Sequence, residues 1–162
     1  MLAPALKRLD VHAAREEDFA AALALAEWEQ QKNPWIDRIP ELLREAVIDP
    51  SGDYRACVAM RDGELIGFGV FGLVAGAAGT GMIYTVLVAP RSRRAGIAQR
   101  LMLYMHAELA NAGVRAIFAE VPGDPCVMRY RALLIAYGFI EEARIEDYYR
   151  DGVPQIVSRF DL

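Results

Sequence analysis

The stretch Met82-Ile-Tyr-Thr-Val-Leu-Val88-Ala-Pro90-Arg-Ser-Arg-Arg94-Ala-Gly96-Ile-Ala98 decides the fold of this chain. Its first part, Met82–Val88, is rich in β-branched and aromatic residues and predicts a buried strand that ends before Pro90. Apolar residues then recur at helical spacing over Ala98–Ala112, which predicts a helix. A strand that runs through a short turn into a helix places the helix N-terminus at the end of the sheet.

The turn between this strand and helix predicts an anion site. Gly96 and Ala98 leave little side-chain bulk where backbone N–H groups are unpaired. Arg91, Arg93 and Arg94 precede them, although cations are disfavoured at a helix start unless an anion is present. The pattern indicates a diphosphate site. A basic helix start with small packing residues is the alternative.

Composition bounds the class of protein. The chain has 162 residues, 54% of them hydrophobic, which predicts one domain over residues 1–162 and excludes intrinsic disorder. Two cysteines exclude a disulfide scaffold, and a four-ligand zinc site would need both histidines as well, so no metal is expected. The net charge of −4 argues against nucleic-acid binding. No acid occurs from Leu65 to Ala107, so this segment carries +4 and the remainder −8.

The other patterns predict a mixed sheet with helices on both faces. Helix periodicity covers Arg15–Gln31, a short segment after Pro40, and Val127–Tyr137. Strand patterns cover Leu9–His12, Tyr54–Met60, Leu65–Val74, Ala116–Val121, Phe139–Tyr149 and Val153–Leu162.

The uncharged run Leu65–Pro90 is long enough to span a membrane. Its six glycines and its Val-, Ile- and Phe-rich ends instead predict two strands. The N-terminus lacks an apolar core long enough for a signal peptide. We therefore expect a cytoplasmic protein without a membrane segment.

Gly67-Phe-Gly69-Val-Phe-Gly72 matches the dinucleotide-binding fingerprint only in its letters. That fingerprint needs a turn from a strand into a helix, whereas these glycines lie inside a strand pattern. Close backbone packing is the expected reason for them.

The motif Val86-Leu-Val-Ala-Pro90, followed by Arg93-x-x-Gly96-x-Ala98, resembles motif A of the GNAT N-acetyltransferase superfamily. Phe118-Ala-Glu120-Val121, Gly138-Phe139 and Tyr148-Tyr-Arg-Asp-Gly152 are similar to the protein N-terminal (ribosomal-protein alanine) acetyltransferase branch. The resemblance implies an α/β (mixed α+β) fold with a mostly antiparallel sheet of about seven strands, flanked by about four helices. It also implies acetyl transfer from acetyl-CoA.

In that superfamily the diphosphate of acetyl-CoA binds at motif A, and the pantetheine arm runs beside the preceding strand. The resemblance therefore assigns the diphosphate to Arg93, Arg94, Ala95, Gly96, Ile97 and Ala98. It assigns the pantetheine arm to the backbone of Leu87 and Val88.

The resemblance also implies two catalytic residues. Glu120 matches the general base of the branch, although a lone Glu at a strand end is commonly only solvated. Leu134 stands where a Tyr usually protonates the leaving thiolate, so Tyr130, one helical turn earlier, is the predicted surrogate. A core aromatic is the alternative for Tyr130. Tyr84, Tyr148 and Tyr149 are candidates for the acceptor slot. The acids from Glu141 to Asp151 are candidates for a mouth that attracts a cationic amine, and a solvated hairpin is the alternative for them.

The sequence therefore predicts an N-acetyltransferase that acts on a peptide N-terminus or a small-molecule amine, as a monomer or homodimer. A non-catalytic acyl-CoA-binding module is the alternative because of Leu134. A cysteine nucleophile, Cys57 or Cys126 with His12 or His106, has no support from spacing.

Overall fold

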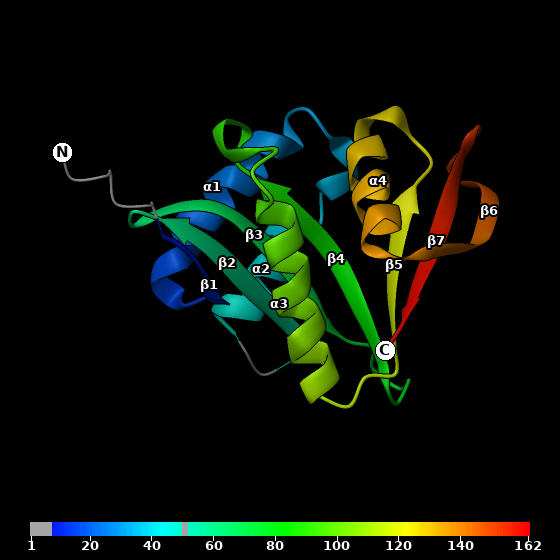
Figure 1. The fold of residues 1–162 in the computed structure, drawn as a ribbon. Coiled ribbons are helices and arrows are strands. Elements are labelled where there is room, and N and C mark those ends of the chain that lie inside the picture. Colours follow the sequence, from blue (N-terminus) through cyan, green and yellow to red (C-terminus); the bar gives the residue numbers. More distant parts are fainter. Residues whose placement is uncertain (1–7, 50–51) are drawn as a thin grey trace.

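A computed structural model describes residues 8–49 and 52–162 (Figure 1). Every predicted strand and helix is present there. The strands are β1 (Leu9–Ala13), β2 (Tyr54–Arg61), β3 (Glu64–Leu73), β4 (Thr80–Val88), β5 (Ala116–Pro122), β6 (Ile140–Arg150) and β7 (Val153–Asp161). The α-helices are α1 (Phe19–Gln30), α2 (Ile39–Val47), α3 (Ile97–Asn111) and α4 (Met128–Tyr137).

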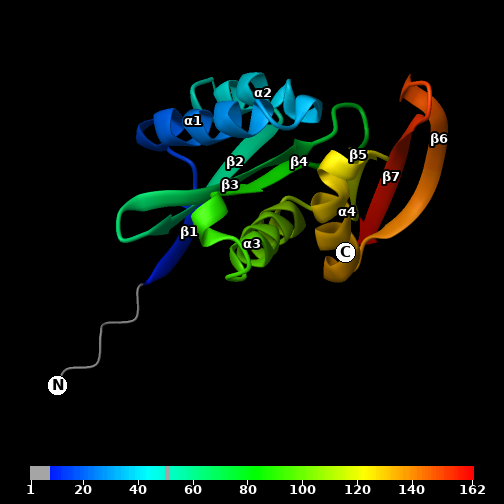
Figure 2. The same ribbon diagram turned by 90° about the horizontal axis from the view of Figure 1, so that it is seen from above.

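The strands form one sheet in the order β1-β2-β3-β4-β5-β7-β6. Every neighbouring pair is antiparallel except β4 and β5, which are parallel. Helices α1 and α2 cover one face of the sheet, and α3 and α4 cover the other (Figure 2). The predicted fold class, a mostly antiparallel sheet between helices, is confirmed.

Two apolar clusters hold these layers together. Between the sheet and α3, the fully buried Leu101, Met105 and Leu109 pack with residues of β2 to β5 and α4. On the other face, α1 and α2 pack against β2 and β3 around Leu43 and Phe68. Burying an apolar side chain of this size contributes roughly 1.5–3 kcal/mol, so both helix layers are firmly attached.

The first helix begins later than the sequence pattern predicts. Residues Glu16–Asp18 form a separate 3-10 turn, and α1 starts at Phe19. The Asp18 carboxylate accepts a hydrogen bond from the Arg15 N–H at 2.8 Å, which closes this turn before the helix begins.

The uncharged run 65–90 is confirmed as strand, since β3 and β4 occupy most of it. Within the described residues, no helix is long and apolar enough to cross a membrane.

Strands β4 and β5 separate soon after they meet. They pair only from Thr80 to Met82 and from Ala116 to Phe118, and then splay apart (Figure 1). A β-bulge helps to redirect β4, because Val70 of β3 pairs with Thr85 and Phe71 pairs with Ile83. Tyr84 is therefore the extra residue of the bulge. The edge of β4 that faces β5 has no strand partner beyond Met82 in the described chain.

The glycines of β3 serve close packing, as the sequence predicts. A Cβ at Gly67 would lie 2.8 Å from the Leu87 carbonyl oxygen, and one at Gly69 would lie 2.7 Å from Met105 Sδ. A Cβ at Gly72 would lie 2.2 Å from the Asp53 carbonyl oxygen. These glycines let β3 approach its neighbours and α3.

We expect Gly72→Ala to destabilise the fold by about 1–3 kcal/mol, because the backbone of Asp53 has to move. The matched control is Gly52→Ala, whose Cβ would meet only Tyr54 at 4.0 Å. The control should leave the free energy of unfolding in urea within about 1 kcal/mol of the parent value. Equal stabilities of the two variants would contradict the close approach at Gly72.

Candidate active site

A cavity of about 570 Å³ occupies the opening between β4 and β5. Helix α1 and the 3-10 turn Pro34–Ile36 line one side, the start of α3 lines another, and α4 closes the end. Of the predicted site residues, the cavity wall includes Tyr84, Leu87, Val88, Arg93, Arg94, Gly96, Ile97, Ala98, Glu120 and Tyr130. The structure therefore brings together the predicted anion turn, the predicted base and the predicted acid. Ala95, Tyr148 and Tyr149 do not line this cavity.

The turn before α3 is shaped for an anion. Gly96 is the N-cap of α3 and adopts a left-handed conformation, with φ 74° and ψ 11°. Apart from its chain neighbours, no atom of the described residues lies within 4 Å of the place where its Cβ would be, so the space above the turn is open. Ile97 is 1% exposed and anchors the helix start in the core. The first amides of α3 therefore point toward the cavity end with no side-chain cap.

Arg93 makes contacts that the sequence did not predict. Its Nη2 lies 3.0 Å from Glu29 Oε2 on α1, and its Nε donates to the Val88 carbonyl oxygen at 3.1 Å. The arginine thus ties α1 to the end of β4 across the cavity. Arg94 makes no such contact and adopts a left-handed φ of 63°.

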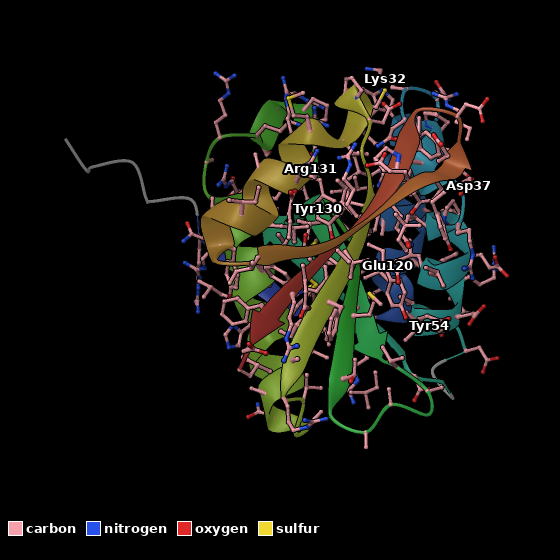
Figure 3. All side chains as sticks on the ribbon, turned by 90° about the vertical axis from the view of Figure 1, so that its right-hand side faces the viewer. Lys32, Asp37, Tyr54, Glu120, Tyr130 and Arg131 are labelled. Carbon is pink, nitrogen blue, oxygen red and sulfur yellow. The ribbon has the colours of Figure 1, made fainter. Side chains whose placement is uncertain are left out.

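Glu120 projects from β5 into the opening between the strands. Ile117, Ala119 and Val121 are buried on the opposite face, as the predicted alternation requires. One oxygen, Oε2, accepts a hydrogen bond from Gln155 Nε2 of β7 at 3.1 Å. In Figure 3, Glu120 lies between Tyr130, toward α4, and Tyr54, toward α1 and α2.

Tyr84 is the bulge residue of β4 and lies next to Tyr54 of β2. Their ring centroids are 5.3 Å apart. Burial raises the pKa of the Tyr84 phenol to about 12, and a hydrogen bond with Tyr54 and the charge of Glu120 add to this. The phenol is therefore neutral at ordinary pH and sits within the electrostatic reach of Glu120.

Tyr130 stands at the vertex where β4 and β5 part. Its hydroxyl donates to the Ile83 carbonyl oxygen at 3.5 Å, a long hydrogen bond, and burial raises the pKa of the phenol. Leu134, one turn later, is 1% exposed and belongs to the core beneath α4. The helix therefore presents Tyr130 to the cavity, while Leu134 faces the protein interior.

The tip of the β6–β7 hairpin reaches the cavity rim. Tyr149 packs edge-on against Trp35, a cavity residue, with ring centroids 5.2 Å apart, and Tyr148 packs edge-on against Tyr149 at 4.9 Å. Arg150 lies 5.3 Å from the Trp35 ring and 3.5 Å from Asp124 Oδ2. The predicted tyrosines are thus at the rim, in contact with the wall.

Three acids of the β6–β7 hairpin pair with arginines. Glu141 pairs with Arg131 of α4, Glu142 with Arg159 of β7, and Glu146 with Arg144 of the same strand. None of these three acids lines the cavity, whose carboxylates are Glu29 and Glu120. The acidic approach for a cationic amine therefore stays a prediction.

The cysteine–histidine alternative gains no support. Cys57 is fully buried, and Cys126 is exposed at the cavity wall. His106 Nδ1 forms a hydrogen bond with the Tyr137 hydroxyl at 2.9 Å, and His12 forms one with the Ala13 carbonyl oxygen.

Across residues 8–49 and 52–162 there is no group of three or more potential metal ligands.

Sequence reasoning missed three groups of this site: Glu29, Trp35 and Gln155. Each comes from an element outside the motif, namely α1, the turn after it, and β7. The resemblance implied only that the segment Trp28–Ile39, which contains Glu29 and Trp35, helps to build the acceptor slot, without naming a residue.

The family model for the acetyltransferase (GNAT) family matches residues 20–125, which is more than half of the chain. No curated protein sequence matches significantly. A solved GNAT-family structure from Desulfovibrio desulfuricans is 22% identical, with a TM-score of 0.86 and coverage of 95% of this chain and 99% of that one.

Two further solved structures show how far the fold is shared. A ribosomal-protein-alanine N-acetyltransferase from Brucella melitensis is 19% identical, with a TM-score of 0.75 and coverage of 94% and 99%. An aminoglycoside 6′-N-acetyltransferase complexed with coenzyme A is 14% identical, with a TM-score of 0.75 and coverage of 94% and 96%. At these identities the likeness establishes the fold, and the two proteins differ in their acceptors.

The buried tyrosines predict an alkaline loss of stability. Because the folded pKa of Tyr84 is about 12 against an ordinary value of 10, its stabilising effect is complete below pH 10 and is lost as the pH rises toward 12. Urea unfolding at pH 9 and pH 11 should show a smaller loss for Tyr84→Phe than for the parent. An equal loss in both proteins would contradict the raised pKa.

Thiol chemistry should distinguish the two cysteines. Burial raises the pKa of Cys57 to about 12, and a hydrogen bond with Asp124 raises the pKa of the exposed Cys126. We expect one thiol to react with a disulfide reagent in the native protein and both to react after unfolding. Asp124→Asn should speed the native reaction, and Cys126→Ser should abolish it. Rapid native reaction of both thiols would contradict the buried position of Cys57.

Proposed function

Because the chain belongs to the GNAT family of acetyltransferases, we propose that it transfers the acetyl group of acetyl-CoA to a primary amine. The observation that carries this proposal is the cavity itself. It joins an uncapped helix N-terminus, an open strand edge and a carboxylate in one continuous space.

The donor side of the cavity fits coenzyme A. The amides of Gly96, Ile97 and Ala98, with Arg93 and Arg94 beside them, suit the diphosphate. The edge of β4 at Leu87 and Val88 has no strand partner on the β5 side and suits the amide-containing pantetheine arm, although Arg93 Nε already donates to the Val88 carbonyl oxygen. Ala95 belongs to the same turn, although it is not in the cavity wall.

In the proposed reaction the amine nitrogen attacks the thioester carbonyl carbon, and the carbon–sulfur bond then breaks. An alkyl ammonium has a pKa of about 10, so it must lose a proton before attack. Glu120, a carboxylate in the cavity wall, is the proposed acceptor of that proton, directly or through a water. Tyr130 lines the cavity and is a phenol, protonated at neutral pH, so it is the proposed donor of a proton to the leaving thiolate.

The acceptor enters, in this proposal, beside Tyr84 and under the rim formed by Trp35, Tyr148 and Tyr149. Aromatic faces and a carboxylate together favour a cation. Both a peptide α-amine and a small-molecule amine meet this requirement. We also propose a cytoplasmic location, monomeric or homodimeric, without nucleic acid as a partner, in keeping with two free thiols and a net charge of −4.

A non-catalytic acyl-CoA-binding module is the second candidate. It is favoured by the buried Leu134, because the resemblance implies a tyrosine that protonates the thiolate at this position. Release of free thiol from acetyl-CoA, followed across a panel of peptides, amino acids and polyamines, separates the two. Thiol release with at least one amine supports the enzyme. Acetyl-CoA binding without release across the panel would support the module.

We predict that Glu120→Gln reduces kcat by about 100-fold or more, because a general base typically contributes at least this factor. Its affinity for coenzyme A, measured by calorimetry, should stay near the parent value. Gly96→Glu should have the opposite effect and abolish coenzyme A binding, because it adds a negative charge and a side chain at the turn proposed to bind the diphosphate. A Glu120→Gln enzyme with unchanged kcat would refute the base.

A further inference from the structure

The inner wall of β7 contributes one buried polar side chain next to the cavity. Gln155 is 5% exposed and contacts Glu120, a residue of the cavity wall. Its register partner on β5 is Pro122, so Gln155 lies diagonally across the ladder from Glu120. Long side chains reach each other across such a diagonal.

The Gln155 amide connects two groups that belong to different elements. Its Nε2 donates to Glu120 Oε2 of β5 at 3.1 Å. Burial raises the pKa of Tyr149 on β6, and a hydrogen bond with the Gln155 side chain opposes that rise. One buried amide therefore reaches the predicted base and the aromatic rim together.

The chemistry of the two groups fixes the orientation of the amide. An ionised carboxylate only accepts hydrogen bonds, so the NH₂ end of Gln155 has to face Glu120. A buried amide that lost this partner would leave a donor unsatisfied, which costs about 1–3 kcal/mol. The bond therefore restrains the carboxylate of Glu120, whose side chain is otherwise exposed.

We propose that Gln155 is a positioning residue that holds the Glu120 carboxylate toward the incoming amine and couples it to Tyr149 at the acceptor rim. This inference rests on the proposed acetyl transfer. A carboxylate that rotates freely at an exposed strand position spends little time in the geometry for proton transfer, and misplacement by 1 Å can cost about 100-fold in rate. Gln155 removes that freedom without touching the reacting atoms.

Gln155→Leu tests the positioning role, because leucine keeps much of the buried volume and removes both N–H donors. We expect kcat to fall by about tenfold to a hundredfold, with little change in the affinity for coenzyme A. Ser158→Ala is the control: Ser158 is also buried and polar on β7, its register partner is Ala119, and its activity should stay at the parent level.

Gln155→Glu tests the positioning role through the pH profile of kcat/KM, which a purely structural role of Gln155 would leave unchanged. Two carboxylates at hydrogen-bond distance resist joint ionisation, so the acid limb of the pH profile of kcat/KM should shift upward by about one pH unit or more. Activity should then recover at alkaline pH. Among the described residues, the charge of Glu120 helps to raise the pKa of Tyr84 of β4 and of Tyr149 of β6, so both phenols are neutral at neutral pH.

A carboxyl ¹³C titration by NMR follows the same coupling without turnover. The Glu120 signal is identified by its loss in Glu120→Gln, and its midpoint should rise in Gln155→Glu. An unchanged midpoint, or a Gln155→Leu enzyme with the parent kcat, would overturn the positioning role alone. If the parent protein releases no thiol with any amine, the proposed function itself is overturned, and the NMR shift then reports a structural pair.

Discussion

The separation of β4 from β5 is the constraint on which the rest of the structure depends. Parallel pairing lasts for three residues on each strand, and the bulge at Tyr84 then helps to turn β4 away. Backbone groups on the open edge of β4 lose their strand partners, and a buried backbone group without a partner is costly. The cavity lies here, and not over the paired strands, because the two strands separate and leave this edge open.

Three parts of the fold converge on this opening. Helix α3 is anchored by Ile97 and brings its uncapped N-terminus to one end. Helix α4 places Tyr130 at the vertex, where its hydroxyl meets the Ile83 carbonyl oxygen. The pair formed by Arg93 and Glu29 ties α1 to the far end of β4. The position of the strand-to-helix turn before α3 thus depends on helices packed against both faces of the sheet.

The two sides of the cavity differ in how they are built. The proposed donor side uses backbone groups and a left-handed glycine, Gly96. The proposed acceptor side uses side chains from three separate elements: Trp35 after α1, Tyr84 on β4 and Tyr149 on β6. Solved structures of the same fold include proteins named for a ribosomal protein and for an aminoglycoside. Such diversity is easier to reach when acceptor groups come from surface segments.

The sequence by itself determined the order of elements, the strand-to-helix turn with Gly96, and the packing role of the glycines in β3, because these depend on local periodicity and on short-range conformation. It also placed Glu120 and Tyr130 among the candidates. Only the tertiary structure decided which side chains share the cavity. Three acids of the β6–β7 hairpin pair with arginines. Gln155 contacts Glu120 across 35 positions of the chain, and Arg93 contacts Glu29 across 64. Contacts at such separations follow from strand order and helix packing, which no local pattern records.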